Sequence, residues 1–248
     1  MNRKKEAKNY DKVSLIYEYI MRKIDYQTWA KYIYSLVKLN LNSNAKVLEI
    51  AAGNCRFANN FSKYFPDLTV TDLSINMLKC DAGNKLAKVC CDMTLLPFNN
   101  KFDLIYSTFD SINYLTSRKK LLTFIKQTAA LLSDNGIFTF DASLERNSLI
   151  HIKEPYRKGN YNGILFEQRS EYNFETRIHK NIFSIVDNDK THLEIHKQKI
   201  FPFETYFEML NNGGLYVKDC FKAFTYDPGD SDSERVQFII KRKKNVNI

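Results

Sequence analysis

Three polar groups follow three apolar runs of the chain at spacings that suit a nucleoside-type ligand. The first run, residues 46–51, ends in the small-residue turn Ala51-Ala52-Gly53-Asn54 and leads directly into a helical pattern at residues 56–65. Such a turn lets a bound molecule approach backbone N–H groups at a helix N-terminus. Asp72 lies nineteen residues beyond Gly53, at the end of the second run. A carboxylate at this place can accept hydrogen bonds from both hydroxyls of a ribose.

The third polar group, Asp92, follows the third apolar run and precedes Met93. An acceptor beside an apolar side chain suits the amino group and the ring face of an adenine. An acidic residue after a strand is more often a turn former or a helix cap, so the prediction depends on the order and spacing of all three groups. Together they indicate a nucleoside site at one edge of a sheet.

The elements that must position these groups alternate along the chain. Amphipathic stretches separate short apolar runs, which predicts βαβ units under a mostly parallel sheet. Ser74 can cap one of the expected helices, which contains Met77 and Leu78. The expected strands are residues 46–51, 68–71, 87–91, 102–108 and 137–142, with helices at 56–65 and 117–132 and a turn at 133–136.

Other segments do not follow this alternation. Residues 10–39 have a helical pattern rich in tyrosine, whereas residues 163–200 hold long runs of alternating polar and apolar residues, which is typical of antiparallel sheet. A helix at 202–210 and strands at 215–224 and 235–241 complete the chain. We therefore expect a single domain over residues 1–248, with an N-terminal helical lid at 1–40 and an inserted antiparallel β cap at 150–201.

Composition limits the class of protein. The 248 residues carry a formal charge of +9, and 44% of them are hydrophobic, which is a globular composition. The charge permits binding to nucleic acid or to an acidic molecule, but solubility alone can explain it. Five cysteines without a C-x-x-C pair predict free thiols in the cytoplasm rather than disulfides or a zinc site. No apolar stretch approaches the ~20 residues of a membrane span, so we expect no membrane association.

The four histidines lie in or near the expected cap. His192 and His196 are four residues apart, but in a segment with a strand pattern this spacing has no clear metal-ligand geometry. Solvated or pocket-lining roles are expected for them, and no metal is expected. The four are His151, His179, His192 and His196.

The motifs described above resemble those of class I S-adenosylmethionine-dependent methyltransferases. The family's first motif, E/D-x-G-x-G-x-G, is similar to Glu49-Ile-Ala51-Ala52-Gly53-Asn54-Cys55, in which alanine and cysteine replace two glycines. The similarity continues through residues 72–78, 92–98, 102–105 and 131–137, and it covers roughly residues 10–142. It implies a Rossmann-like α/β sheet, mostly parallel with an antiparallel C-terminal strand, and S-adenosylmethionine as the cofactor.

The resemblance also implies roles for individual residues. An aromatic cover over the methionine part is expected from the N-terminal lid, and Ser107, after the fourth strand, is expected at the sulfonium end. The implied contacts are Glu49, Ala51, Ala52, Gly53 and Asn54 for the methionine part, Asp72 for the ribose, Leu73 and Met77 for the adenine faces, Asp92 and Met93 for the adenine edge, and Tyr10, Tyr17 and Trp29 for the cover.

Methyl transfer from a sulfonium mainly needs alignment of a nucleophile, with a general base where the acceptor must lose a proton. Asp110, Asn113 and Tyr114, after the fourth strand, could face the acceptor, although Asp110 could equally cap a short helix and Tyr114 could equally pack in the core.

The N-P-P-Y-like tetrapeptide and the Pro-Cys pair of nucleic-acid methylating enzymes are absent from the sequence, which favours a small-molecule acceptor. An RNA acceptor, a nicotinamide-dependent enzyme and a non-catalytic cofactor-binding protein remain as alternatives. The sequence gives no indication of the oligomeric state.

Overall fold

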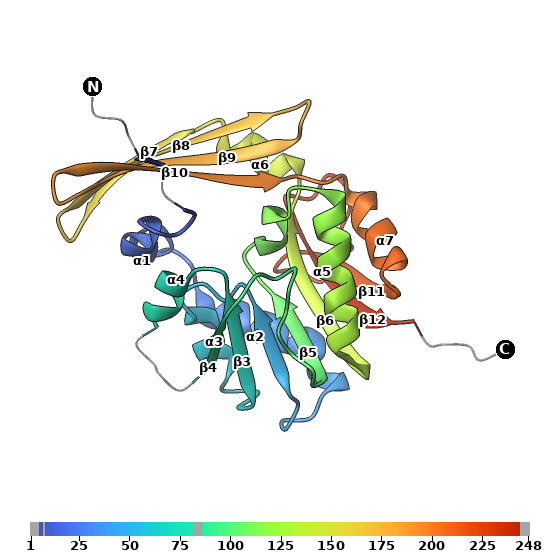
Figure 1. Cartoon of the computed structure of the whole chain (residues 1–248). Coiled ribbons are helices and arrows are strands. Elements are labelled where there is room, and N and C mark those ends of the chain that lie inside the picture. The colour runs from blue at the N-terminus through green and yellow to red at the C-terminus, as the bar shows by residue number, and fades with distance from the viewer. Residues whose placement is uncertain (1–4, 7, 82–85, 244–248) are drawn as a thin grey trace.

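The computed structural model describes residues 5–6, 8–81 and 86–243 and contains two sheets. The larger sheet has seven strands in the order β11-β12-β6-β5-β2-β3-β4 (Figure 1). Its strands are β2 (Val47–Ile50), β3 (Leu68–Asp72), β4 (Ala87–Cys90), β5 (Phe102–Ser107), β6 (Leu132–Ser143), β11 (Leu215–Lys222) and β12 (Arg235–Arg242).

The pairing within this sheet is parallel from β4 to β6 and antiparallel at β12. All four residues of β2 are buried, as expected for a parallel strand covered on both faces. β2 pairs with β3 on one side and with β5 on the other, so the chain changes its direction of winding there. Such a switch point leaves a crevice beyond the carboxyl ends of the strands. The predicted mostly parallel sheet with an antiparallel C-terminal strand is confirmed.

Helices cover both faces of the seven-stranded sheet (Figure 1). α5 (Arg118–Leu131) and α7 (Phe203–Asn212) share one apolar cluster with Leu48 and Ile50, whereas α2 (Tyr26–Val37) and α3 (Arg56–Phe61) share another with Val47. Side chains of β2 therefore alternate between the two clusters, as the period of a strand requires. α4 (Ile75–Lys79) begins where predicted, because the Ser74 hydroxyl accepts a hydrogen bond from the Met77 N–H.

The second sheet forms a separate layer beyond the carboxyl ends of the parallel strands (Figure 1). It contains β7 (Tyr156–Tyr161), β8 (Ile164–Asn173), β9 (Ile178–Asp187) and β10 (Lys190–Lys199), all antiparallel, and β1 (Lys5–Glu6) pairs in parallel with β10. Two-residue turns with positive φ, Asn162-Gly163 and Asn188-Asp189, connect β7 to β8 and β9 to β10. Such turns match the twist of antiparallel hairpins. This sheet confirms the predicted antiparallel insertion. We call it the cap.

The N-terminal segment packs under the cap. It consists of the short helices η1 (Val13–Leu15) and α1 (Tyr17–Ile20), followed by α2 and η2 (Lys38–Asn40), so the helical pattern at 10–39 is broken rather than continuous. Val13 and Ile16 form an apolar cluster with Phe166, Phe183 and Ile185 of the cap. We call residues 8–24 the lid. Residues 1–4 and 7 of the lid expected at 1–40 lie outside the described residues.

The expected turn at 133–136 is instead part of β6, which begins at Leu132. The register between β5 and β6 shifts after the Phe102–Leu132 pair, because the next pair is Leu104–Ile137. The residues that were expected to form a turn are therefore accommodated as an irregularity within the strand.

Two remaining short helices flank the crevice, η3 (Ser111–Tyr114) and α6 (Glu145–His151). Among the residues that the structure describes, no helix is long and apolar enough to cross a membrane. Within the same residues, no group of His, Cys, Asp and Glu side chains could hold a metal ion. All five cysteines are free thiols.

Candidate cofactor and acceptor sites

The turn between β2 and α3 has left-handed backbone at every second residue. Ala51, Gly53 and Cys55 have φ values of 60°, 58° and 60°. These are the positions where the resembled motif carries glycine, and the conformation explains that preference, because only glycine adopts it without strain. The Cys55 side chain is fully buried in the apolar cluster of α2 and α3, so it does not crowd the cavity beside the turn.

Gly53 lies close to Met77 of α4 and to Tyr17 of the lid. A Cβ atom at Gly53 would lie 3.3 Å from the Met77 Cε atom and 3.8 Å from the Tyr17 hydroxyl. The Gly53 N–H donates a hydrogen bond of 2.8 Å to Asp72 Oδ2, and the Ser74 N–H donates one of 2.7 Å to Oδ1. These two contacts fix the Asp72 carboxylate at the end of β3. Burial raises its pKa above the ordinary value.

A cavity of about 200 Å³, the cofactor cavity, opens at the carboxyl ends of β2, β3 and β4. The sequence thus correctly predicts that the three strand ends meet at one sheet edge. Asp92 lies at the cavity wall with Oδ1 accepting hydrogen bonds of 2.7 Å from the Thr94 N–H and hydroxyl. The predicted site residues that line the cavity are Tyr10, Tyr17, Ala51, Ala52, Gly53, Asn54, Asp72, Leu73, Met77, Asp92 and Met93.

Three residues expected in the cofactor site do not line this cavity. Glu49 is buried under the turn, where the Tyr106 hydroxyl donates a hydrogen bond of 3.0 Å to Oε2, and burial raises the pKa of Glu49 to about 8. Ser107 is buried in β5 and lines neither cavity described here. Trp29 lines the second cavity rather than the first. Its ring packs on that of Phe109, with centroids 4.0 Å apart.

The second cavity, of about 620 Å³, lies between the sheet edge, the lid and the cap. We call it the acceptor cavity. Tyr10, Tyr17, Phe109 and Tyr114 line both cavities and form the wall between them. The two cavities therefore meet across four aromatic side chains.

Asp110 lies in the acceptor cavity in a fixed position. It has a left-handed backbone with φ of 48° and precedes η3. Its carboxylate accepts hydrogen bonds from Gln198 Nε2 at 2.8 Å and from the Ser143 hydroxyl at 3.1 Å, and it pairs with Arg235 Nη2 at 3.0 Å. Arg235 also pairs with Asp141, whose pKa burial raises to about 6. The Arg235 guanidinium thus pairs with Asp110, which lines the cavity with it, and with Asp141, which is buried behind them.

Asn113 does not face the acceptor cavity, in contrast to the expectation from the sequence. It is fully buried and lines neither cavity. Its amide donates to the backbone oxygens of Ser143 at 3.1 Å and Lys199 at 2.9 Å, and it accepts from the Ser143 N–H at 3.0 Å. Asn113 therefore ties β6 to the end of the cap and has a structural place.

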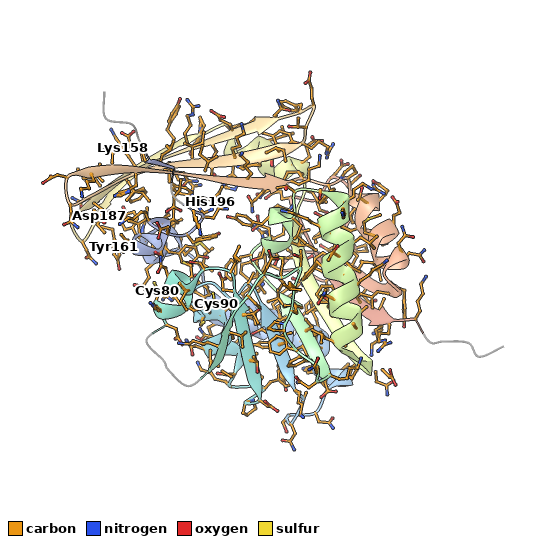
Figure 2. All side chains as sticks on the ribbon, in the orientation of Figure 1. Cys80, Cys90, Lys158, Tyr161, Asp187 and His196 are labelled. Atoms are coloured by element: carbon orange, nitrogen blue, oxygen red, sulfur yellow. The ribbon has the colours of Figure 1, made fainter. Side chains whose placement is uncertain are left out.

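Tyr114 begins a chain of partly buried hydrogen bonds that crosses from η3 to the cap. Its hydroxyl lies 2.7 Å from the Tyr10 hydroxyl and 3.0 Å from His196 Nδ1. His196 Nε2 lies 3.2 Å from Glu194 Oε2, and Glu194 Oε1 accepts hydrogen bonds from the N–H groups of Lys12 and Val13. Figure 2 shows His196 beneath the cap, on the side facing the seven-stranded sheet.

The sequence predicts neither Phe109 as a cavity residue nor Glu194 as the partner of one. Glu194 and His196 are two residues apart in a strand and therefore share a face, which is the only signal that could have linked them. Phe109 reaches the wall through a left-handed backbone with φ of 60°, which no pattern in the sequence indicates. Tyr26 lines the cofactor cavity with its buried hydroxyl, which has no hydrogen-bond partner among the described residues.

His179 of the cap and His151 of α6 also line the acceptor cavity, whereas His192 of the cap does not. Burial lowers the pKa of both, that of His179 to about 4. Both rings are therefore neutral at pH 7.

Comparisons with known proteins agree with this geometry. Residues 47–136 match a family model described as a methyltransferase domain. The Bacillus subtilis (strain 168) protein YqeM is provisionally named a methyltransferase. It is 24% identical to this chain, over 96% of this chain and 98% of its own length.

Solved structures show the same fold. A S-adenosylmethionine-dependent methyltransferase from Clostridium acetobutylicum ATCC 824 superposes with a TM-score of 0.76 at 23% identity, covering 94% of this chain and 98% of that one. CalS10 from Micromonospora echinaspora, an amino pentose methyltransferase solved with S-adenosylmethionine bound, superposes with a TM-score of 0.69 at 15% identity, covering 92% and 97%.

Proposed function

We propose that this chain, a class I S-adenosylmethionine-dependent methyltransferase, methylates an amino or hydroxyl group of a small polar molecule held in the acceptor cavity. The observation that carries the proposal is the aromatic wall of Tyr10, Tyr17, Phe109 and Tyr114, which the cofactor and acceptor cavities share. A methyl group presented at this wall would be within reach of a nucleophile on its other side.

The cofactor cavity fits the nucleoside and methionine parts of S-adenosylmethionine. Gly53 leaves a cradle that a Cβ atom would fill, the Asp72 carboxylate stands at the end of β3, and the unpartnered hydroxyl of Tyr26 is available to a polar group. In the proposal Asp72 binds the ribose hydroxyls, Leu73, Met77 and Met93 contact the adenine, and the backbone of residues 51–54 holds the methionine part. Aromatic faces at the shared wall stabilise a neighbouring sulfonium cation.

The acceptor cavity favours a small polar acceptor. It is closed above by the cap and at the side by the lid, and its lining mixes aromatic rings with hydrogen-bonding groups such as Asp110 and Gln198. The Asp110 carboxylate, which lines the cavity beside Arg235, favours a ligand that donates hydrogen bonds or carries positive charge. CalS10, which shares the fold, is named for an amino pentose, and this supports an amine- or hydroxyl-bearing acceptor.

The protein's contribution to the reaction is mainly positioning. S-adenosylmethionine supplies a methyl group already activated by its positive sulfur. The cavity walls align the nucleophile with that group and exclude water, and proximity of this kind accounts for much of the rate enhancement in such displacements. The free thiols Cys55, Cys80, Cys90, Cys91 and Cys220 support a cytoplasmic location.

The proposal is tested by calorimetry and by labelled methyl transfer. S-adenosylmethionine and S-adenosylhomocysteine should bind with micromolar dissociation constants, and Asp72→Asn should weaken binding at least tenfold because the ribose loses a charged acceptor. Asp67→Asn, at the opposite end of β3, is the matched control and should bind as the wild type.

With a methyl-labelled cofactor and a metabolite extract, the label should enter a small molecule. Label in added RNA would favour a nucleic-acid acceptor instead. Tight cofactor binding without transfer to either fraction would favour a non-catalytic binding protein.

A further inference from the structure

We infer that Glu194 and His196 direct a chain of hydrogen bonds that makes the Tyr10 phenol oxygen a proton acceptor at the wall of the acceptor cavity. The inference rests on the proposed function, since it names the group that takes the proton of the methylated amine or hydroxyl. Tyr10 would touch the reacting atoms, whereas Tyr114, His196 and Glu194 act through it as positioning and relay residues.

The chain spans three separate parts of the molecule. Tyr10 belongs to the lid, Tyr114 to η3 at the sheet edge, and Glu194 and His196 to β10 of the cap. Consecutive polar atoms lie 2.7, 3.0 and 3.2 Å apart along the chain. All of these separations lie within or close to hydrogen-bond distance.

The direction of the chain follows from Glu194. Its side chain is fully buried, and Oε1 accepts the N–H groups of Lys12 and Val13, the latter at 3.0 Å. As a carboxylate it can only accept hydrogen bonds, so His196 must donate to it from Nε2. In the neutral imidazole Nδ1 is then without a proton, and it accepts from the Tyr114 hydroxyl.

Tyr114 and Tyr10 continue the chain of hydrogen bonds to the cavity wall. A phenol has one proton, and that of Tyr114 is used toward His196, so the Tyr114 oxygen accepts from Tyr10. The Tyr10 proton is in turn used in the hydrogen bond to the Tyr114 oxygen. No other described residue hydrogen-bonds to the remaining lone pairs of the Tyr10 oxygen, and Tyr10 lines both cavities. Every donor in the chain therefore points away from the cavity.

The rings of the chain are held by packing. The His196 ring meets Tyr10 edge-to-face with centroids 4.6 Å apart and contacts Phe183 at 5.2 Å. Tyr10 in turn meets Tyr17 edge-to-face at 5.9 Å. Tyr10 also has a left-handed backbone with φ of 61°, and strained backbone of this kind persists only where its surroundings fix it.

The proposed proton transfer balances. As the acceptor nitrogen or oxygen forms its bond to the methyl carbon, the carbon–sulfur bond breaks and its electron pair stays on sulfur, which becomes a neutral thioether. The acceptor's proton passes to the Tyr10 oxygen, the Tyr10 proton passes to Tyr114, and the Tyr114 proton passes to His196 Nδ1. His196 ends as an imidazolium beside the Glu194 carboxylate, so one positive charge is lost at sulfur and one is gained at His196.

The first test reads the tautomer of His196 by nitrogen-15 NMR and needs no acceptor. Wild-type protein should carry the proton on Nε2, with Nδ1 bare. In Glu194→Gln, the amide oxygen would keep the Lys12 and Val13 N–H groups and its NH₂ would face His196 Nε2, so the ring should switch to the Nδ1–H form. A wild-type ring protonated on Nδ1 alone, or a Glu194→Gln ring that does not switch, would overturn the inference.

The second test measures kcat with labelled cofactor and the acceptor-containing extract. Tyr10→Phe and His196→Gln should each lower kcat by about 10²-fold, the low end for loss of a general base, with the dissociation constant for S-adenosylhomocysteine within about twofold of wild type in His196→Gln. His192→Gln, two residues before Glu194 on β10 and outside both cavities, is the control and should keep wild-type kcat.

The two tests separate failure of the inference from failure of the proposed function. If His196→Gln folds, binds S-adenosylhomocysteine and keeps wild-type kcat, the relay is wrong although methyl transfer occurs. If the wild type transfers no label, the proposed function fails, and the tautomer measurement alone decides the direction of the chain.

Discussion

The left-handed backbone at Ala51 lowers the stability of the folded protein at the centre of the cofactor site. A non-glycine residue with this conformation is destabilised by roughly 1–2 kcal/mol, whereas glycine costs roughly 0.5–1 kcal/mol in chain entropy. Ala51→Gly should therefore stabilise the protein by about 0.5–1 kcal/mol and raise Tm by about 1–4 °C in thermal unfolding. Ala52→Gly is the control, since Ala52 has no positive φ, and it should lower Tm.

The opposite outcome, a lower Tm for Ala51→Gly than for the wild type, would contradict the assigned strain. Cys55 has the same backbone conformation but a fully buried side chain, so Cys55→Gly loses apolar burial that offsets the relief of strain. The two replaced glycines of the motif thus differ in their energetic effect.

Glu49 gives the protein a stability that depends on pH. Burial raises its pKa to about 8 from an unfolded value near 4.5, so between these values the folded state binds a proton that the unfolded state has lost. Stability from this group is therefore full below about pH 4.5 and falls as pH rises toward 8, by up to ~1.4 kcal/mol per pH unit.

Denaturant unfolding of the cofactor-free protein at several pH values measures this effect. Glu49→Gln keeps an acceptor for the Tyr106 hydroxyl and cannot ionise, so its stability relative to wild type should increase steadily from pH 5 to pH 8. Glu175→Gln, on an exposed loop, should leave the pH profile unchanged. A constant difference between Glu49→Gln and wild type would show that Glu49 titrates normally.

At the scale of elements, the lid is held to the cap by its own small apolar cluster. Ile16 is fully buried there, beside Phe183 and Ile185 of β9. Because the lid carries Tyr10 and Tyr17 to both cavities, we expect its packing to control cofactor binding.

Ile16→Ala removes buried apolar surface, a change that typically costs 2–5 kcal/mol, and the loss should fall mainly on the lid. Amide exchange in residues 8–24 should accelerate, and S-adenosylhomocysteine binding should weaken about tenfold. Leu15→Ala, one residue earlier and largely exposed, should change neither quantity. Equal exchange rates in wild type and Ile16→Ala would contradict this role of the cluster.

The sequence predicts elements best where a local signal exists. The Ser74 cap, the parallel strands and the antiparallel insertion all follow from side-chain types and periodicity. The irregularity of β6 at residues 133–136 does not, because it depends on the register shift between the Phe102–Leu132 and Leu104–Ile137 pairs with β5, which no local pattern indicates. The positions of Trp29, Ser107 and Asn113 relative to the cavities do not follow either, because their surroundings come from distant segments. Trp29, for example, packs on Phe109 and Phe224.

At the scale of the whole molecule, the two sheets divide the work of the site. The cap lies beyond the carboxyl ends of the parallel strands (Figure 1). The seven-stranded sheet presents the turn, Asp72 and Asp92 at these ends, whereas residues of the cap and the lid line the acceptor cavity. Tyr10, Tyr17, Phe109 and Tyr114 stand where the two halves meet. Methyl transfer between the two cavities therefore requires the cofactor sulfur to lie at this wall.

A crystal structure of the protein soaked with S-adenosylhomocysteine tests that claim most directly. The account predicts the ribose hydroxyls on the Asp72 carboxylate, the adenine between Leu73 and Met77, and the sulfur atom facing the aromatic wall that borders the acceptor cavity. A ligand bound in another cavity, or a sulfur atom turned away from Tyr10 and Tyr114, would contradict it.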